Sequence, residues 1–275
     1  RMVRRCDVVA AVDIDAAARF RSHGSDAHFL PNGCDTATMA LTNSVDPAAG
    51  VDLPPPVAGF IGVLNDRTDL ALLEQVVDCG SSLLVVGPHQ AGFDEDRVMR
   101  LRRRPRVRFV GPVPFDDLPS YLSHVDVGLV PYADTPFNRA SFPLKTLDYL
   151  AAGRPVVATD LPALRWLAED FVDATNGPDP ASSDLRLAAD GASFARAVVD
   201  LARCSDPRDV ERRTLLALRH DWSARAALMA RWCGLDTPVD APVDTPVNTP
   251  TTVRHDAPTD RVGGTPDGSP DDRRS

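Results

Sequence analysis

The sequence predicts an α/β protein in which helices cover both faces of a Rossmann-like parallel sheet. From residue 57 onward, apolar runs of strand length alternate with amphipathic stretches of helix length, which is the pattern of repeated βα units. The 275 residues, 43% of them hydrophobic, suffice for a substantial core. Strands are expected at residues 57–63, 82–86, 107–110, 125–130, 156–159 and 185–188, and helices at 69–78, 94–103, 115–123, 142–152, 162–169 and 192–204.

The first 42 residues hold a smaller set of elements. Apolar runs predict strands at 6–12 and 28–30, with a helix at 16–22 between them and a turn at 31–33. Asp13 stands where the first strand gives way to the helix, a position that favours an N-cap. A competing interpretation takes Asp13 and Asp15 as a D-x-D metal site.

A domain boundary is expected at 43–56, because three consecutive prolines at 54–56 make this segment stiff and extended. The second domain then covers 57–233 and ends with a helical stretch at 211–233, which is either a closing helix or an ordinary core-covering one. Residues 234–275 repeat a Thr-Pro-Val-Asp pattern with little apolar surface, so we expect a disordered tail.

Composition excludes several function classes. A net charge of −9 argues against a general nucleic-acid binder. The five cysteines are widely spaced without a C-x-x-C pair and the six histidines form no cluster, so neither a disulfide framework nor a metal site is expected, and a reducing cytoplasm fits best. Dinucleotide-binding, P-loop, zincin and G-x-S-x-G motifs are missing. The chain begins with Arg1 and is therefore expected to be a piece of a longer protein.

The helix expected at 142–152 has the features of an anion site. Ser141 can cap it, Pro143 suits its first turn, and Gly153 can take the left-handed closing position. Lys145 adds a charge to the free N–H groups at the tip, which favours a diphosphate. Lys145 is the only lysine among 30 basic residues. A lysine kept in a chain that otherwise uses arginine is expected to be required for its compact ammonium, which a planar guanidinium cannot replace. Asp148 lies on the same face, where a carboxylate can accept from two sugar hydroxyls.

The turn after the strand at 57–63 is the second candidate for ligand contact, because parallel sheets bind ligands at the carboxyl ends of their strands. Gly62 would let a ligand approach the backbone, and Arg67 supplies a fork for phosphate oxygens. The alternative for Arg67 is an ordinary surface arginine, since 28 others are present.

A resemblance to a known family rests on Ser141, Pro143, Lys145 and the runs at 148–153 (Asp-Tyr-Leu-Ala-Ala-Gly) and 155–157 (Pro-Val-Val). These residues resemble the donor-site helix of retaining GT-B glycosyltransferases, especially a branch that makes bacterial cell-wall and capsular polysaccharides. The family pattern has two glutamates with seven residues between them. Here the second is the shorter Asp148 and the first falls on Ala140.

The resemblance implies the C-terminal, donor-binding half of a GT-B fold, with 1–42 as the end of the N-terminal domain and 43–56 as the linker. It implies that Lys145 and Arg67 neutralise the departing diphosphate without a metal or other cofactor, and that Asp148 holds the ribose. The remaining donor-binding residues that we expect are Gly62, Asn65, Phe142, Pro143 and Leu144.

The implied function is transfer of a sugar from a nucleotide-diphosphate sugar to a glycan or lipid-linked acceptor, though this chain alone is expected to be inactive. Two alternatives stay open. One is a non-catalytic nucleotide-sugar binding or regulatory module. The other is a flavodoxin-like or response-regulator-like domain, although this sequence lacks the acidic cluster and the phosphate loop that such domains require. No nucleic-acid partner is expected. A cytoplasmic location is expected, with peripheral association at the inner face of the membrane and self-association left open.

Overall fold

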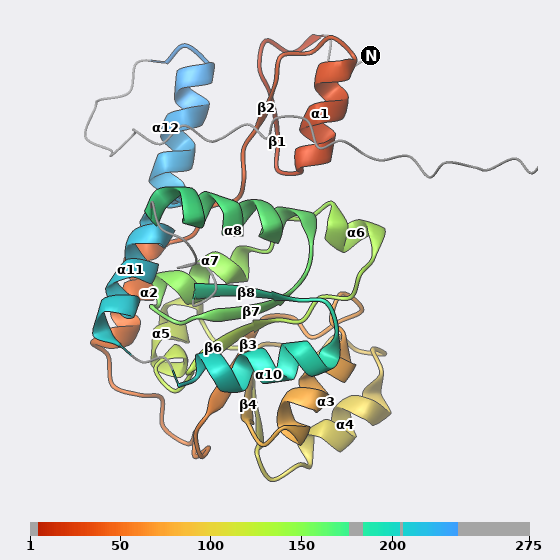
Figure 1. Cartoon of the computed structure of the whole chain (residues 1–275), viewed down its shortest axis with the longest axis vertical. Coiled ribbons are helices and arrows are strands. Elements are labelled where there is room, and N and C mark those ends of the chain that lie inside the picture. Colours follow the sequence, from red (N-terminus) through yellow and green to blue (C-terminus); the bar gives the residue numbers. More distant parts are fainter. Residues whose placement is uncertain (1–4, 176–183, 204–205, 236–275) are drawn as a thin grey trace, which may run out of the picture.

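The computed structural model describes residues 5–175, 184–203 and 206–235, and its centre is a six-stranded sheet (Figure 1). All neighbouring strands are parallel, in the order β5-β4-β3-β6-β7-β8. Every residue of β3, β4 and β6 is buried, as expected for a parallel sheet covered on both faces. The strands are β3 (Val57–Ile61), β4 (Ser82–Val86), β5 (Val107–Gly111), β6 (Val127–Val130), β7 (Val156–Thr159) and β8 (Leu185–Ala188).

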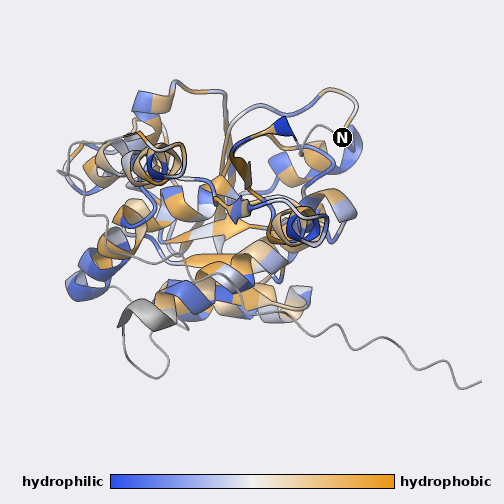
Figure 2. Ribbon diagram, turned by 90° about the horizontal axis from the view of Figure 1, so that it is seen from above, coloured by the Kyte–Doolittle hydropathy of each residue, from blue (hydrophilic) through white to orange (hydrophobic). Residues whose placement is uncertain are grey.

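Two apolar clusters, one on each face, confirm the predicted layers. One face carries α3 (Leu70–Asp78), α4 (Glu95–Arg102) and α10 (Gly191–Leu201). The other carries α5 (Leu118–Leu122), α7 (Leu144–Ala151), α8 (Pro162–Thr175) and α11 (Pro207–Leu218). Seen from above, the strands between the helices are among the most hydrophobic parts of the chain (Figure 2). The fold class is therefore the one that the alternating pattern predicts.

Several element boundaries differ from the expected ones. The strand expected at 57–63 ends at Ile61, and the helix expected at 142–152 begins at Leu144. The stretch expected as one helix at 211–233 is two helices: α11 ends at Leu218, and Asp221 then caps α12 (Trp222–Trp232) by accepting from Ser223 N. The helix expected at 115–123 is a 3₁₀ turn, η3 (Phe115–Asp117), followed by α5.

The N-terminal residues form a separate two-stranded parallel sheet, β1 (Val9–Ala11) and β2 (Ala27–Phe29), with α1 (Ile14–Ser22) beside it. Asp13 caps α1 by accepting from the backbone N–H groups of Asp15 and Ala16. The capping role is thus the one the structure supports. Among the described residues no group of three or more His, Cys, Asp or Glu side chains could hold a metal ion, so the D-x-D interpretation gains nothing.

Two short helices that the sequence did not predict follow β2: α2 (Thr36–Ala40) and η2 (Leu41–Asn43). Their buried Met39 belongs to the apolar cluster that also contains residues of α7 and α11. Short helix α6 (Pro136–Arg139) lies in the segment between β6 and α7, for which the sequence predicted no helix.

Helix α12 leaves the large sheet and runs alongside the N-terminal unit (Figure 1). Its Trp232 stacks on His28 of β2, with ring centroids 4.3 Å apart. Where the chain crosses, Cys34 N donates to His220 O at 3.0 Å and Trp222 N donates to Cys34 O at 3.1 Å. The chain therefore passes between the small unit and the large one twice, near Cys34 and near Trp222, and these two segments lie side by side.

No helix among the described residues is long and apolar enough to cross a membrane. The tail expected at 234–275 lies outside the described residues except for its first two positions.

Candidate functional site

A pocket of about 170 Å³ opens where β3 and β6 end and α7 begins. These two neighbouring strands lead to opposite halves of the sheet, so their carboxyl ends form the switch point at which α/β sheets bind ligands. Most of the predicted site residues line it; Gly62 and Asp148 do not. The sequence did not single out Val63 and Tyr132, although both directly follow the strands concerned. The lining is Val63, Asn65, Arg67, Tyr132, Phe142, Pro143, Leu144 and Lys145.

The Lys145 side chain passes directly over Gly62. A Cβ at Gly62 would overlap Lys145 Cε and lie 2.5 Å from its Nζ, and Gly62 has φ +134°, a conformation that favours glycine. Gly62 is thus needed both for its backbone angle and for the approach of the lysine. Gly87, behind it, is similarly close, because a Cβ there would overlap the Gly62 carbonyl.

The Lys145 ammonium lies in an environment that disfavours its charge. Burial lowers the pKa of Lys145, the attraction of Asp148 opposes this, and the nearby Arg67 lowers the pKa further. Among the described residues, no hydrogen bond or salt bridge of the ammonium is found. A partly buried cation with an incomplete set of partners is suited to an incoming anion.

Helix α7 presents free N–H groups at its first turn. Its N-cap is Pro143, with no side-chain cap hydrogen bond, so the expectation that Ser141 caps this helix was wrong. Ser141 Oγ instead donates to Asn138 O at 3.0 Å. The predicted closing position of Gly153 is confirmed by its φ of +76°. The uncapped tip leaves backbone N–H groups next to Lys145.

Arg67 reaches the pocket from the turn after β3 and is held on several sides. Its Nε donates to Asn138 Oδ1 at 2.9 Å, and its Nη2 donates to Ser141 Oγ at 3.1 Å. Its guanidinium lies over the Tyr132 ring at 4.8 Å and over the Phe137 ring at 4.9 Å. These contacts do not fit the alternative of an ordinary surface arginine. Asn65, in the same turn, accepts from Arg67 N at 3.2 Å.

Asp148 lies one turn beyond Lys145 on α7 but does not line the pocket. Burial raises the pKa of its carboxyl to about 6, Lys145 opposes the shift, and Asp35 of the α2 cap adds to it. Asp148 therefore faces the side where the N-terminal unit meets α7. Asn32 of that unit donates to Phe142 O at 3.1 Å, a contact with the helix tip that the sequence gave no sign of.

Tyr149 anchors α7 in the sheet. Its buried hydroxyl accepts from Ile61 N and donates to Gly59 O, both at 2.8 Å. A Cβ at Gly128 of β6 would lie 2.6 Å from the ring atom Cδ1. The ring thus packs against Gly128 of β6 while its hydroxyl bonds β3, and it fixes the helix that carries Lys145 to the strand that precedes Gly62.

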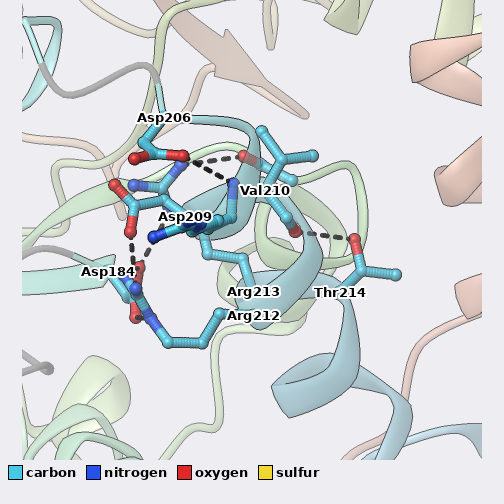
Figure 3. Close-up of polar contacts among 9 residues, drawn as sticks. Asp184, Asp206, Asp209, Val210, Arg212, Arg213 and Thr214 are labelled. Atoms are coloured by element: carbon cyan, nitrogen blue, oxygen red, sulfur yellow. Dashed lines mark hydrogen bonds and ion pairs between the residues drawn. The ribbon is translucent and has the colours of Figure 1, made fainter.

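A buried ion pair between Asp184 and Arg213 (Figure 3) contacts the backbone just past the C-terminal end of α7. Arg213 Nε of α11 donates to Asp184 Oδ1 at 2.8 Å, and Arg213 Nη1 donates to Gly153 O at 3.1 Å. Arg212 donates to both carboxylate oxygens of Asp184 at 2.7 Å. The C-terminal half of helix α7 is consequently held at two points, at Tyr149 and at Gly153, which fixes the helix that carries Lys145.

The family model described as "Glycosyl transferases group 1" matches residues 55–203. A curated relative, the "Putative teichuronic acid biosynthesis glycosyltransferase TuaH" of Bacillus subtilis, is 35% identical over 118 residues, 42% of this chain and 30% of that protein. A phosphatidyl-myo-inositol mannosyltransferase of Propionibacterium freudenreichii is 26% identical over 233 residues, 81% of this chain and 55% of that protein.

Solved structures of similar fold include a sucrose-phosphate synthase of Thermosynechococcus elongatus, with a TM-score of 0.60 and 20% identity over 85% of this chain and 59% of that one. The Anabaena protein HepE, solved with UDP, also has a TM-score of 0.60, with 14% identity over 83% of this chain and 64% of that one. The chain thus spans about a third to two thirds of the length of these proteins.

Proposed function

Because the chain belongs to the glycosyl transferases group 1 family, we propose that it is the donor-binding part of an enzyme that moves a sugar from a nucleoside-diphosphate sugar to a glycan or lipid-linked acceptor. The observation that carries this proposal is the Lys145 ammonium, which lies beside the uncapped tip of α7, over Gly62, in a pocket that Arg67 also lines. Two cations and free amides suit the two charges of a diphosphate. HepE, whose structures hold UDP and UDP-glucose, supports uridine diphosphate as the first donor to test.

The proposed chemistry is electrostatic. As the bond between the sugar and the diphosphate breaks, negative charge grows on the leaving oxygens. Lys145, Arg67 and the amides of α7 stabilise that charge in a partly water-excluded site. Hydrogen-bond donors that are already in position before the reaction need little reorganisation when the charge develops. The contacts that fix α7 and Arg67 therefore contribute to catalysis. We propose that no metal takes part, and that the sugar is transferred with retention of its anomeric configuration.

Asp148 is proposed to accept from the ribose hydroxyls, on the side of the pocket nearest the N-terminal unit. We further propose the division into an N-terminal remnant at 1–42, a linker at 43–56 and the donor domain at 57–233. The acceptor then binds on the N-terminal domain, of which the described residues hold one small sheet. The alternative of a non-catalytic binding module is not favoured by relatives that are both named as transferases.

The test is a binding panel on the purified chain. Calorimetry with UDP, GDP and ADP, each with and without EDTA, should give one nucleoside diphosphate that binds with micromolar to millimolar affinity and is unaffected by the chelator. Binding that disappears with EDTA would contradict the metal-free proposal, and no binding of any diphosphate would contradict the donor site. The anomeric configuration of a product, read by NMR from a full-length enzyme, tests retention.

A further inference from the structure

Asn138 of α6 is a fully buried polar residue beside the pocket, with 0% of its surface exposed. It comes 71 residues after Arg67 in the sequence, yet the two side chains are in direct contact. Asn138 Oδ1 accepts from Arg67 Nε at 2.9 Å, while Asn138 Nδ2 donates to Arg67 O at 3.0 Å and to Ala133 O at 2.8 Å. The amide therefore has a defined orientation, because its oxygen faces a donor and its nitrogen faces two acceptors.

The contacts made by Asn138 restrict Arg67 at both its backbone and its head group. The guanidinium also lies between the Tyr132 and Phe137 rings, at 4.8 and 4.9 Å. With Nε bonded to Asn138 and Nη2 bonded to Ser141, the edge that carries Nη1 is left for the pocket. A guanidinium that binds phosphate oxygens gains from a fixed plane, since less rotamer entropy is lost when the ligand arrives.

We propose that Asn138 is a positioning residue for Arg67: its buried amide sets the plane of the guanidinium, so that the Nη1 edge faces the phosphates of the donor. The proposal rests on the proposed function only where it names the phosphates. The statement that Asn138 orients Arg67 is independent of the ligand and is tested separately.

The competing role for Asn138 is to hold the segment 133–140 against the turn after β3, through the carbonyls of Ala133 and Arg67 that it satisfies. The two roles are separable by substitution. Asn138→Ala removes all three hydrogen bonds. Asn138→Asp keeps an acceptor for Arg67 Nε and removes the donors to these two carbonyls. Thr135→Ala is the matched control, because Thr135 Oγ1 caps α6 by accepting from Asn138 N at 3.2 Å and is not bonded to the guanidinium.

The first measurement follows the Arg67 Nε–Hε signal by NMR, in the full chain and without ligand. A bonded, buried Nε–H should exchange slowly with water. We expect the slow exchange to persist in the Thr135→Ala and Asn138→Asp variants and to be lost in Asn138→Ala. Slow exchange that survives in Asn138→Ala, or that is lost equally in all three variants, would overturn the positioning role.

The second measurement is a double-mutant cycle on nucleoside-diphosphate affinity, with the diphosphate that binds best and its monophosphate as probes. We expect Asn138→Ala to weaken diphosphate binding about tenfold in the native background and to have no further effect in the Arg67→Ala background. An equal loss in both backgrounds would mean that Asn138 acts on the segment 133–140 alone. If no diphosphate binds the native chain, the proposed function fails, while the exchange measurement still decides the role of Asn138.

Discussion

Replacing Gly62 by alanine is the sharpest test of how the pocket is built, because one methyl group falls on the Lys145 side chain. The Cβ would overlap Lys145 Cε and lie 2.5 Å from Nζ. The lysine end is flexible, so the clash is relieved when the side chain swings away. The backbone angle of +134° cannot be relieved in the same way and costs about 1–3 kcal/mol of stability.

The loss of binding follows from the charge that is displaced. An ammonium 4 Å from a phosphate contributes about 4 kcal/mol at an effective dielectric constant of 20, an upper value that desolvation reduces. We expect Gly62→Ala to weaken diphosphate binding about 10- to 100-fold, which corresponds to about 1.4–2.8 kcal/mol. The free energy of unfolding of Gly62→Ala should fall only by the cost of the strained backbone angle.

The assay combines chemical denaturation with calorimetric titration of a nucleoside diphosphate. Gly80→Ala is the matched control, because Gly80 has φ +93°, a methyl group added to it would meet nothing within 4 Å, and the length of β4 separates it from the pocket. It should lose similar stability and no affinity. In a Lys145→Ala background, Gly62→Ala should cost no further affinity. An undiminished affinity in Gly62→Ala alone would refute the placement of the lysine.

Three further predictions concern neighbouring groups. Asp148→Asn should weaken ribonucleotides more than 2′-deoxyribonucleotides in parallel titrations, and native affinity should rise as the pH rises through about 6, where the carboxyl ionises; equal losses for both sugars would assign Asp148 to the fold. Tyr149→Phe strands a donor and an acceptor inside the sheet and should cost about 2–4 kcal/mol by urea denaturation; a loss below about 0.5 kcal/mol would contradict the anchor. His220 has its pKa lowered by burial, with Asp170 of α8 opposing the shift and Arg225 of α12 adding to it. The neutral imidazole should therefore stabilise the fold above the unfolded pKa of about 6.5, and this stabilisation should be lost as the pH falls below that value. In His220→Gln the melting temperature should depend less on pH between pH 7 and 5. An unchanged slope would exclude His220 as the source of the pH dependence.

The fold class could be predicted because it depends on local pattern. Runs such as 82–86 are apolar at nearly every position, and the helices expected on both flanks, at 69–78 and 94–103, are confirmed as α3 and α4. Helix α7 was placed too early because Ser141 is a good cap in isolation. In the folded chain its hydroxyl is taken by Asn138 O and Arg67, which are set by tertiary contacts.

The site was predictable where it follows from strand ends and helix tips. Lys145 and Arg67 were found on those grounds, and both line the pocket. The contacts around them were not predictable, since Asn138 bonds Arg67 across 71 residues of sequence and Asn32 bonds Phe142 O across 110 residues. A single sequence carries no signal for such pairs. The same holds for the Tyr149 hydroxyl, which a periodicity argument treats as one more buried apolar residue.

The central claim is that the Lys145 ammonium meets the diphosphate of a nucleotide donor. Its most direct test is calorimetric titration of native chain and Lys145→Ala with UDP and with UMP, with Lys145→Arg as a second variant. We predict that Lys145→Ala loses at least about tenfold more affinity for UDP than for UMP, and that Lys145→Arg is also impaired, because a planar guanidinium cannot replace a compact ammonium above Gly62. Equal losses for UDP and UMP, or full binding by both variants, would contradict the claim.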